Sequence, residues 1–214
     1  MKLLTSNTKI EKSTTAFPDY EATILQMLPG KGVCVNYKDC LSDCLAFTGF
    51  AKIFGSVNKS RKAKKDYFLK DYENFMIQLI KEVKNQEKRA NKKGKRAVIR
   101  LNGFTDIDWS KCIKRYGDLN IFQLFPSVIF YDYSADYNKV QNNRQANYHL
   151  TFSYKGNNMD ECINLLKIGV NIAVIDTPEN RDTWFNKMPA IQGDAHDFRF
   201  LDSDASIVWL SFKK

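Results

Sequence analysis

Short strand-like segments that alternate with helical segments place the strongest limit on how this chain folds. Runs rich in Val, Ile and Phe occur at residues 21–28, 96–101, 128–133, 148–154, 171–176 and 207–212. Helical patterns lie between them, at 62–91, 108–115, 159–168 and 178–186. This alternation predicts βα units. We therefore expect an α/β fold, either a partial, six-stranded β/α barrel or an open, largely parallel sheet, with one long basic helix.

The length and the apolar content are typical of one α/β domain over residues 1–214, with residues 1–15 as a loose lead-in. The chain has 43% apolar residues, including 15 Phe, which is enough to form a substantial core. It contains no continuous apolar run long enough to span a membrane, and the polar residues 1–15 do not resemble a secretory signal. We therefore expect the protein in a reducing cytoplasm.

Three of the five cysteines, Cys34, Cys40 and Cys44, lie within eleven residues of one another. In a reducing compartment such a cluster is more typical of a metal site than of disulfides. Three thiolates can hold an iron–sulfur cluster, or three of the four corners of a zinc site with His196 as the fourth ligand. The alternative is that these thiols are small buried hydrophobes, as free cysteines often are.

Polar residues follow several of the predicted strands, where parallel α/β proteins bind their ligands. One Asp after a strand is often only a helix cap, but repetition from strand to strand predicts a shared site. As proton-transfer or anion-pairing groups we take Asp106, Asp132, Asp194, His196 and Arg199. As groups that hold a cofactor or substrate we take Asn102, Gly103, Asp106 and Ser153.

The excess positive charge is confined to residues 57–96, which hold 14 Lys and Arg against 5 Asp and Glu, so that the rest of the chain is neutral. A helix carrying these cations can bind nucleic acid phosphates, with Tyr67 and Phe68 as stacking groups. The alternative is a solvated helix face that only keeps the protein in solution. The candidate phosphate-binding residues are Arg61, Lys62, Lys64, Lys65, Arg89, Lys92 and Lys93.

Five motifs resemble a family of bacteriophage and mobile-element proteins, the gene product 88 family. They are VCVNYKDCLSDCLAFTG, RLNGFTDIDW, FYDYS, NYHLTFS and GDAHDFRFLD, in the same order, from about Leu25 to the C-terminus. The resemblance implies a phage, prophage or plasmid origin, and hence the cytoplasm of a bacterial host, more than it implies an activity.

A weaker likeness is to the radical S-adenosylmethionine enzymes, which place three cysteines after the first strand of a partial β/α barrel. That likeness implies a [4Fe–4S] cluster on Cys34, Cys40 and Cys44, with S-adenosylmethionine near Asn102 and Asp106. The cysteine spacing here, C-x5-C-x3-C, differs from that family's usual C-x3-C-x2-C, so the likeness is topological.

Three functions remain open on the sequence. The first is a metal-dependent, iron–sulfur enzyme of phage or mobile-element origin that acts on a nucleotide or a nucleic acid base. The second is a zinc-containing enzyme that modifies bases or hydrolyses its substrate at the same strand ends. The third is a non-catalytic nucleic-acid-binding protein whose cysteines are structural.

Overall fold

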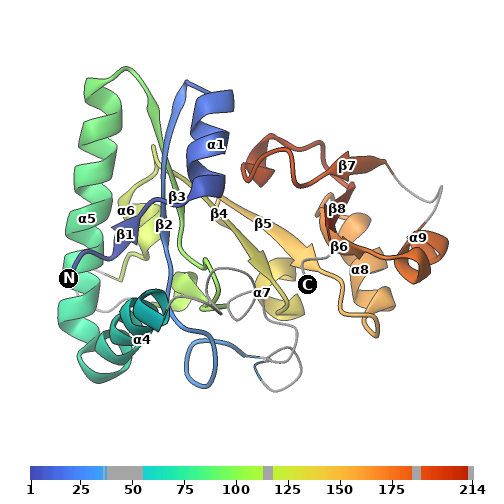
Figure 1. Ribbon diagram of the computed structural model, residues 1–214, viewed down its shortest axis with the longest axis horizontal. Helices are drawn as coiled ribbons and strands as arrows, with labels where there is room; N and C mark the ends of the chain where they lie inside the picture. Colours follow the sequence, from blue (N-terminus) through green and yellow to red (C-terminus); the bar gives the residue numbers. More distant parts are fainter. Residues whose placement is uncertain (36, 38–54, 113–117, 185–188, 212–214) are drawn as a thin grey trace.

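The computed structural model describes residues 1–35, 37, 55–112, 118–184 and 189–211. Within them, eight strands form one open sheet in the order β1-β2-β3-β4-β5-β6-β8-β7 (Figure 1). The strands are β1 (Leu4–Thr5), β2 (Tyr20–Leu25), β3 (Arg96–Arg100), β4 (Ile129–Ser134), β5 (Tyr148–Ser153), β6 (Ile172–Asp176), β7 (Ala190–Gln192) and β8 (Ile207–Ser211). All neighbours are parallel except β1 and β2.

The helices of the described residues connect these strands. They are α1 (Thr8–Ala16), α4 (Gly55–Lys70), α5 (Tyr72–Lys92), α6 (Ile121–Leu124), α7 (Tyr137–Gln141), α8 (Met159–Leu166) and α9 (Pro178–Trp184), with short 3₁₀ turns η2 (Trp109–Lys111) and η3 (Arg199–Leu201). No described helix has the length and apolar character that crossing a lipid bilayer requires.

The α/β prediction is confirmed, and the six predicted strands are β2, β3, β4, β5, β6 and β8. These strands lie side by side in chain order. Because parallel crossovers are right-handed, an order without reversal places successive connections on the same face of the sheet. The packing agrees: α5 and α6 cover Ile99 and Phe130, and α7, α8 and α9 cover Phe152 and Val174 on the same face.

The opposite face of the sheet is covered by α1 and by the segment between β7 and β8. Ile10 of α1 and Phe198 pack there against Ile24, Val98 and Tyr131. The expectation of a loose lead-in at residues 1–15 is therefore wrong. Asn7 caps α1 by accepting a hydrogen bond from Ile10 N at 2.9 Å, so this polar segment forms a helix with few apolar residues.

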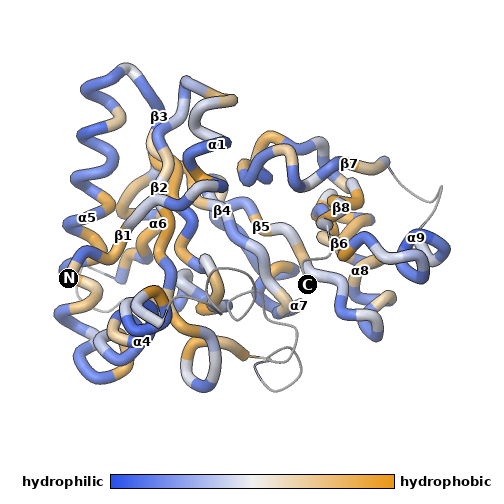
Figure 2. The backbone as a smooth tube through the Cα atoms, in the orientation of Figure 1, coloured by the Kyte–Doolittle hydropathy of each residue, from blue (hydrophilic) through white to orange (hydrophobic). Residues whose placement is uncertain are grey.

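The long basic helix predicted at residues 62–91 is two helices, α4 and α5. The helix is interrupted at Asp71, whose side chain accepts a hydrogen bond from Asn74 N and caps α5. α5 lies along the outer edge of the molecule beside β1 and β2 (Figure 1). Its apolar residues face the sheet and its polar residues face outward (Figure 2). Gly94, at φ +66°, follows its end.

Candidate functional site

The ends of β3 and β4 meet as the sequence predicts, through Asn102 and Asp132. The Asp132 carboxylate is fully buried. It accepts hydrogen bonds from Asn102 N at 2.7 Å, from Asn102 Nδ2 at 3.1 Å and from the Tyr148 hydroxyl at 2.9 Å. Burial raises the pKa of Asp132 to about 6, although nearby Lys139 and Arg100 oppose the shift. The carboxylate therefore ties three strands together and has no exposed surface.

Asn102 builds the loop that follows β3. Its Oδ1 accepts hydrogen bonds from Thr105 Oγ1 at 2.9 Å, Ile107 N at 3.0 Å and Trp109 Nε1 at 3.2 Å. Its Nδ2 also donates to Ile107 O at 3.0 Å. The polar atoms of this side chain are occupied within the protein, which is the pattern of a residue that shapes a loop.

Gly103 brings the same loop against the end of β2. Its N–H donates to Leu25 O at 3.0 Å. A Cβ atom at this position would lie 2.8 Å from that oxygen, closer than van der Waals contact permits. The glycine motif that the sequence assigns to a cofactor thus has a packing role in this structure.

Asp106 joins the loops that follow β2, β3 and β4. Its carboxylate accepts hydrogen bonds from Ser134 Oγ and Ala135 N, both at 2.8 Å, and forms an ion pair with buried Lys139 at 2.8 Å. Its backbone N–H donates to Val33 O at 2.9 Å. Asp106 and Asp132 therefore lie at the same edge of the sheet, each held by several partners.

Cys34 lies at this edge too, beside the loop after β3. Its half-buried Sγ accepts from Gly30 N at 3.5 Å and lies 4.0 Å from Phe104 O. Cys40 and Cys44 lie outside the described residues, so the three-cysteine site stays a prediction. Within the described ranges, no group of three or more His, Cys, Asp or Glu side chains is arranged to hold a metal ion.

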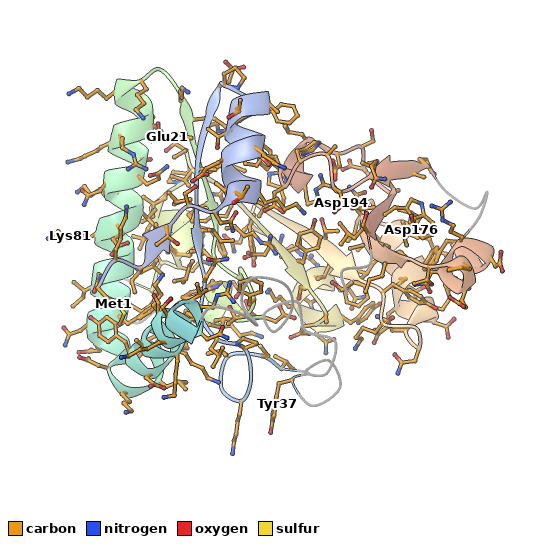
Figure 3. All side chains as sticks on the ribbon, viewed as in Figure 1. Met1, Glu21, Tyr37, Lys81, Asp176 and Asp194 are labelled. Atoms are coloured by element: carbon orange, nitrogen blue, oxygen red, sulfur yellow. The ribbon has the colours of Figure 1, made fainter. Side chains whose placement is uncertain are left out.

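Of the remaining predicted residues, Asp194 lies apart from this site, and Ser153 lies on the strand next to β4. Asp194 accepts a hydrogen bond from Ser211 N at 2.7 Å, at the end of β8. Ser153 ends β5, where its carbonyl accepts a hydrogen bond from Asn158 Nδ2 at 3.1 Å. Figure 3 shows Asp194 far from Tyr37, which follows Cys34 by three residues.

His196 and Arg199 lie on the α1 side of the sheet, and this placement corrects the zinc hypothesis with His196 as a ligand. The His196 ring packs on Phe17, which precedes β2, whereas Cys34 follows β2. Arg199 donates to His196 Nδ1 at 3.1 Å and to its carbonyl at 2.6 Å, and pairs with buried Asp202 at 3.1 Å. Burial lowers the pKa of His196, and Arg199 adds to that shift.

Sequence reasoning missed Asp197, which is the centre of the charged network on this face. The Tyr131 hydroxyl donates to it at 2.7 Å, and Arg100 and Lys9 pair with it at 3.1 and 3.3 Å. Burial would raise the pKa of Asp197, but these cations and the hydroxyl hold it below its usual value. The available signal in the sequence was a pair of opposite charges: Arg100 at the end of β3, and Asp197 in the GDAHDF motif.

The predicted phosphate-binding residues of α4 have structural contacts. Lys64 is 4% exposed and donates to Leu3 O at 2.9 Å. Burial lowers the pKa of its ammonium group. Arg61 is also buried and its guanidinium lies 4.2 Å from the centre of the Phe104 ring. Lys65 donates to Pro29 O at 3.3 Å, and Lys62 pairs with Asp66 at 2.6 Å.

The predicted stacking aromatics are also used inside the protein. Phe68 is buried against Phe75 and Trp109, and Tyr67 packs edge-to-face on Phe75 with ring centroids 5.4 Å apart. Phe68 is therefore not accessible to a base, which corrects that part of the prediction, whereas Tyr67 is half-buried. The apolar pattern of α4 serves to attach it to α5.

Two predicted cations at the C-terminal end of α5, Arg89 and the capping residue Lys93, are held by Glu21 of β2. Arg89 Nε lies 2.6 Å from the Glu21 carboxylate, and Lys93 Nζ lies 2.8 Å from it. Together the two cations lower the pKa of Glu21, against the opposing effect of burial. Both side chains are about half exposed, and because two cations share one carboxylate, this flank of α5 keeps a net charge of +1.

The outer face of α5 carries a row of exposed lysines, and Lys88 and Lys92 of this row belong to the cations that the sequence predicts as phosphate-binding. We name as the lysine row Lys81, Lys84, Lys88 and Lys92. At 3.6 residues per turn these four positions fall within an arc of about 80°, opposite the buried stripe of the helix. In the part of the chain that the structure describes, none of the four forms an ion pair. Figure 3 shows Lys81 pointing away from the sheet.

These features define an α/β protein with a singly wound, mostly parallel sheet and a basic outer helix. A family model described as gene product 88 matches residues 1–214, so the chain belongs to the gene product 88 family. No curated protein and no solved structure matches the chain.

Proposed function

We propose that this protein binds the phosphate backbone of nucleic acid through the lysine row of α5. The observation that carries the proposal is the alignment of four exposed lysines on one helix face without acidic partners among the described residues. A lysine side chain is a compact, mobile point charge, suited to phosphate contacts and not to reading base edges. The proposed binding is therefore independent of sequence.

The affinity in this proposal comes from counterion release. Each phosphate that a lysine neutralises frees condensed cations, so the logarithm of the association constant falls linearly with the logarithm of salt concentration. Four contacts on a duplex give a slope of about −3.6. This is the behaviour of a weak, electrostatic DNA-binding surface.

The carboxylates at the strand ends give less support to an enzyme. Asp132 is fully buried, and Asp106 is held by a cation and two hydrogen-bond donors. A general acid or base needs access to the proton that it transfers. The lysine row, in contrast, is exposed to solvent, so a ligand can reach it.

The test is to replace the lysine row by glutamine and to measure duplex DNA binding by fluorescence anisotropy. The matched control variant replaces four other exposed lysines, Lys12, Lys31, Lys155 and Lys167. Both variants lose the same net charge, so a general electrostatic effect lowers binding equally in both. The proposal requires a much larger loss in the lysine-row variant, and equal losses refute it.

A second function, a metal-dependent enzyme that acts on a nucleotide or a nucleic acid base, is favoured by the position of Cys34. Its thiol lies at the carboxyl ends of β2 and β3, beside Asp106, as a site on Cys34, Cys40 and Cys44 requires. Such a site would hold a [4Fe–4S] cluster, with S-adenosylmethionine as the co-substrate, or a zinc ion with a fourth ligand other than His196.

The metal content of protein purified without oxygen tests this second function. Iron and sulfide, or one zinc per chain, should be lost when Cys34, Cys40 and Cys44 are all replaced by serine. Burial raises the pKa of Cys112 to about 11, so Cys112→Ser is the control and should retain the metal. Wild-type protein without metal, or a triple variant with full metal content, contradicts the metal site.

A further inference from the structure

We infer, on the basis of the proposed function, that the ligand of the lysine row is a nucleic acid duplex and not a single strand. Proteins that hold single strands combine a positive groove with aromatic side chains on which the bases stack. The α5 surface has the positive charge and lacks the aromatic component.

No aromatic residue occurs between Lys81 and Lys92 in the sequence. Tyr72, at the start of α5, is the nearest partly exposed aromatic on this helix, and its ring packs edge-to-face on Phe68 with centroids 5.6 Å apart. A single strand on this surface would gain phosphate contacts but no stacking, which contributes about 1–3 kcal/mol per base in single-strand binders.

The lysine row is straight, and its length matches several base pairs. Lys92 lies eleven positions after Lys81, which corresponds to about 16 Å along the helix axis. Over this length a duplex presents about ten phosphates, because both strands together carry one charge per 1.7 Å. A single strand carries roughly half that charge per unit length. The same four lysines therefore release more counterions on a duplex.

The two flanking cations do not change this result. Arg89 and Lys93 share the single carboxylate of Glu21, and the net charge of +1 that they keep attracts a duplex and a single strand alike. The slopes are therefore worked out for the four lysines of the row. Four contacts predict a salt slope of about −3.6 for a duplex and about −2.8 for a single strand. Between 50 and 200 mM salt, the association constant then falls roughly 150-fold for a duplex and roughly 50-fold for a single strand.

The experiment compares three ligands of equal length: a duplex DNA, one of its strands, and a duplex of unrelated sequence. Each is titrated with wild-type protein, with the lysine-row variant and with the control variant described above. The expected result is tighter binding of both duplexes, with equal affinity, a slope near −3.6, and loss of binding in the lysine-row variant alone.

The outcomes separate this inference from the proposed function. If the single strand binds as tightly as the duplexes and the lysine-row variant loses that binding, the inference is wrong and the proposed function stands. If the lysine-row and control variants bind all three ligands equally, the proposed function itself fails. If the two duplexes differ markedly in affinity, base readout contributes and the backbone-only account is overturned.

Discussion

Asp197→Asn removes the negative charge that two partly buried cations, Arg100 and Lys9, share. Its side chain is 1% exposed, and that of its partner Arg100 is 15% exposed. Removing one member of a buried ion pair costs about 3–5 kcal/mol, because the remaining charge is left uncompensated in a poorly solvated site. Lys9 is one-third exposed, so water screens its charge and the loss of its pair with Asp197 adds little to the cost.

Asparagine keeps an oxygen that can accept the hydrogen bond from the Tyr131 hydroxyl, so the lower end of that range applies. We expect Asp197→Asn to lower the free energy of unfolding by about 3 kcal/mol. For a chain of this size the melting temperature then falls by roughly 6–12 °C. Asp197→Ala also leaves the Tyr131 hydroxyl without an acceptor, and should cost about 1–3 kcal/mol more.

Urea denaturation followed by circular dichroism measures both variants. Asp176→Asn is the matched control, because Asp176 pairs with Arg181 at the solvent-exposed surface and its loss should change stability little. The fold keeps the pKa of Asp197 low, so its contribution is present above the usual aspartate pKa and is lost as the pH falls through the lower, folded value. A cost below about 1 kcal/mol for Asp197→Asn, equal to that of a surface pair, would refute the network.

Two further predictions concern the strand ends. Because burial raises the pKa of Asp132 to about 6, folding favours its protonated form, and this contribution to stability is lost as the pH rises from about 4 through 6. Asp132→Asn should remove that part of the pH dependence, about 2–3 kcal/mol, as measured by urea unfolding at pH 4 and pH 7. An unchanged pH profile would contradict the assigned pKa. Gly103→Ala should destabilise the protein by about 1–3 kcal/mol because its Cβ would meet Leu25 O. Gly55→Ala is the control and should not, because no atom of the described residues lies within 4 Å of the new Cβ. Equal melting temperatures for the two variants would contradict the close approach of the loop to β2.

The six strands β2, β3, β4, β5, β6 and β8 could be predicted because each one is rich in apolar, β-branched or aromatic residues that are buried in the sheet. The strands that sequence reasoning missed lack this signal: β1 has two residues, and β7 has three, of which Ala190 and Gln192 are exposed. The break between α4 and α5 was missed for a different reason. The apolar spacing continues across it, and the only local signal is the capping side chain of Asp71.

The candidate site was predictable where it depends on neighbouring strands. Asn102 and Asp132 meet because β3 and β4 are adjacent and parallel. His196 and Arg199 were misplaced because the chain between β7 and β8 crosses the opposite face of the sheet, beside α1. Which face a connection without a helix takes is decided by tertiary packing, which local residue patterns do not contain.

The basic segment was predictable as a charged region but not residue by residue. Lys62 and Lys64 have the same local surroundings in the sequence, yet Lys62 is exposed and Lys64 is buried against the carbonyl of Leu3. That difference depends on where the N-terminal strand crosses the helices. Only the three-dimensional structure separates the cations that hold the fold together from those that form the lysine row.

Phosphate binding by the lysine row is tested most directly by the salt dependence of duplex DNA binding, measured for wild-type protein and for the lysine-row variant. Four phosphate contacts predict a slope of about −3.6 for the wild-type protein, and their removal predicts a slope near zero for the lysine-row variant. The variant that lacks Lys12, Lys31, Lys155 and Lys167 should keep nearly the wild-type slope. A lysine-row variant with the wild-type slope and affinity would contradict the account.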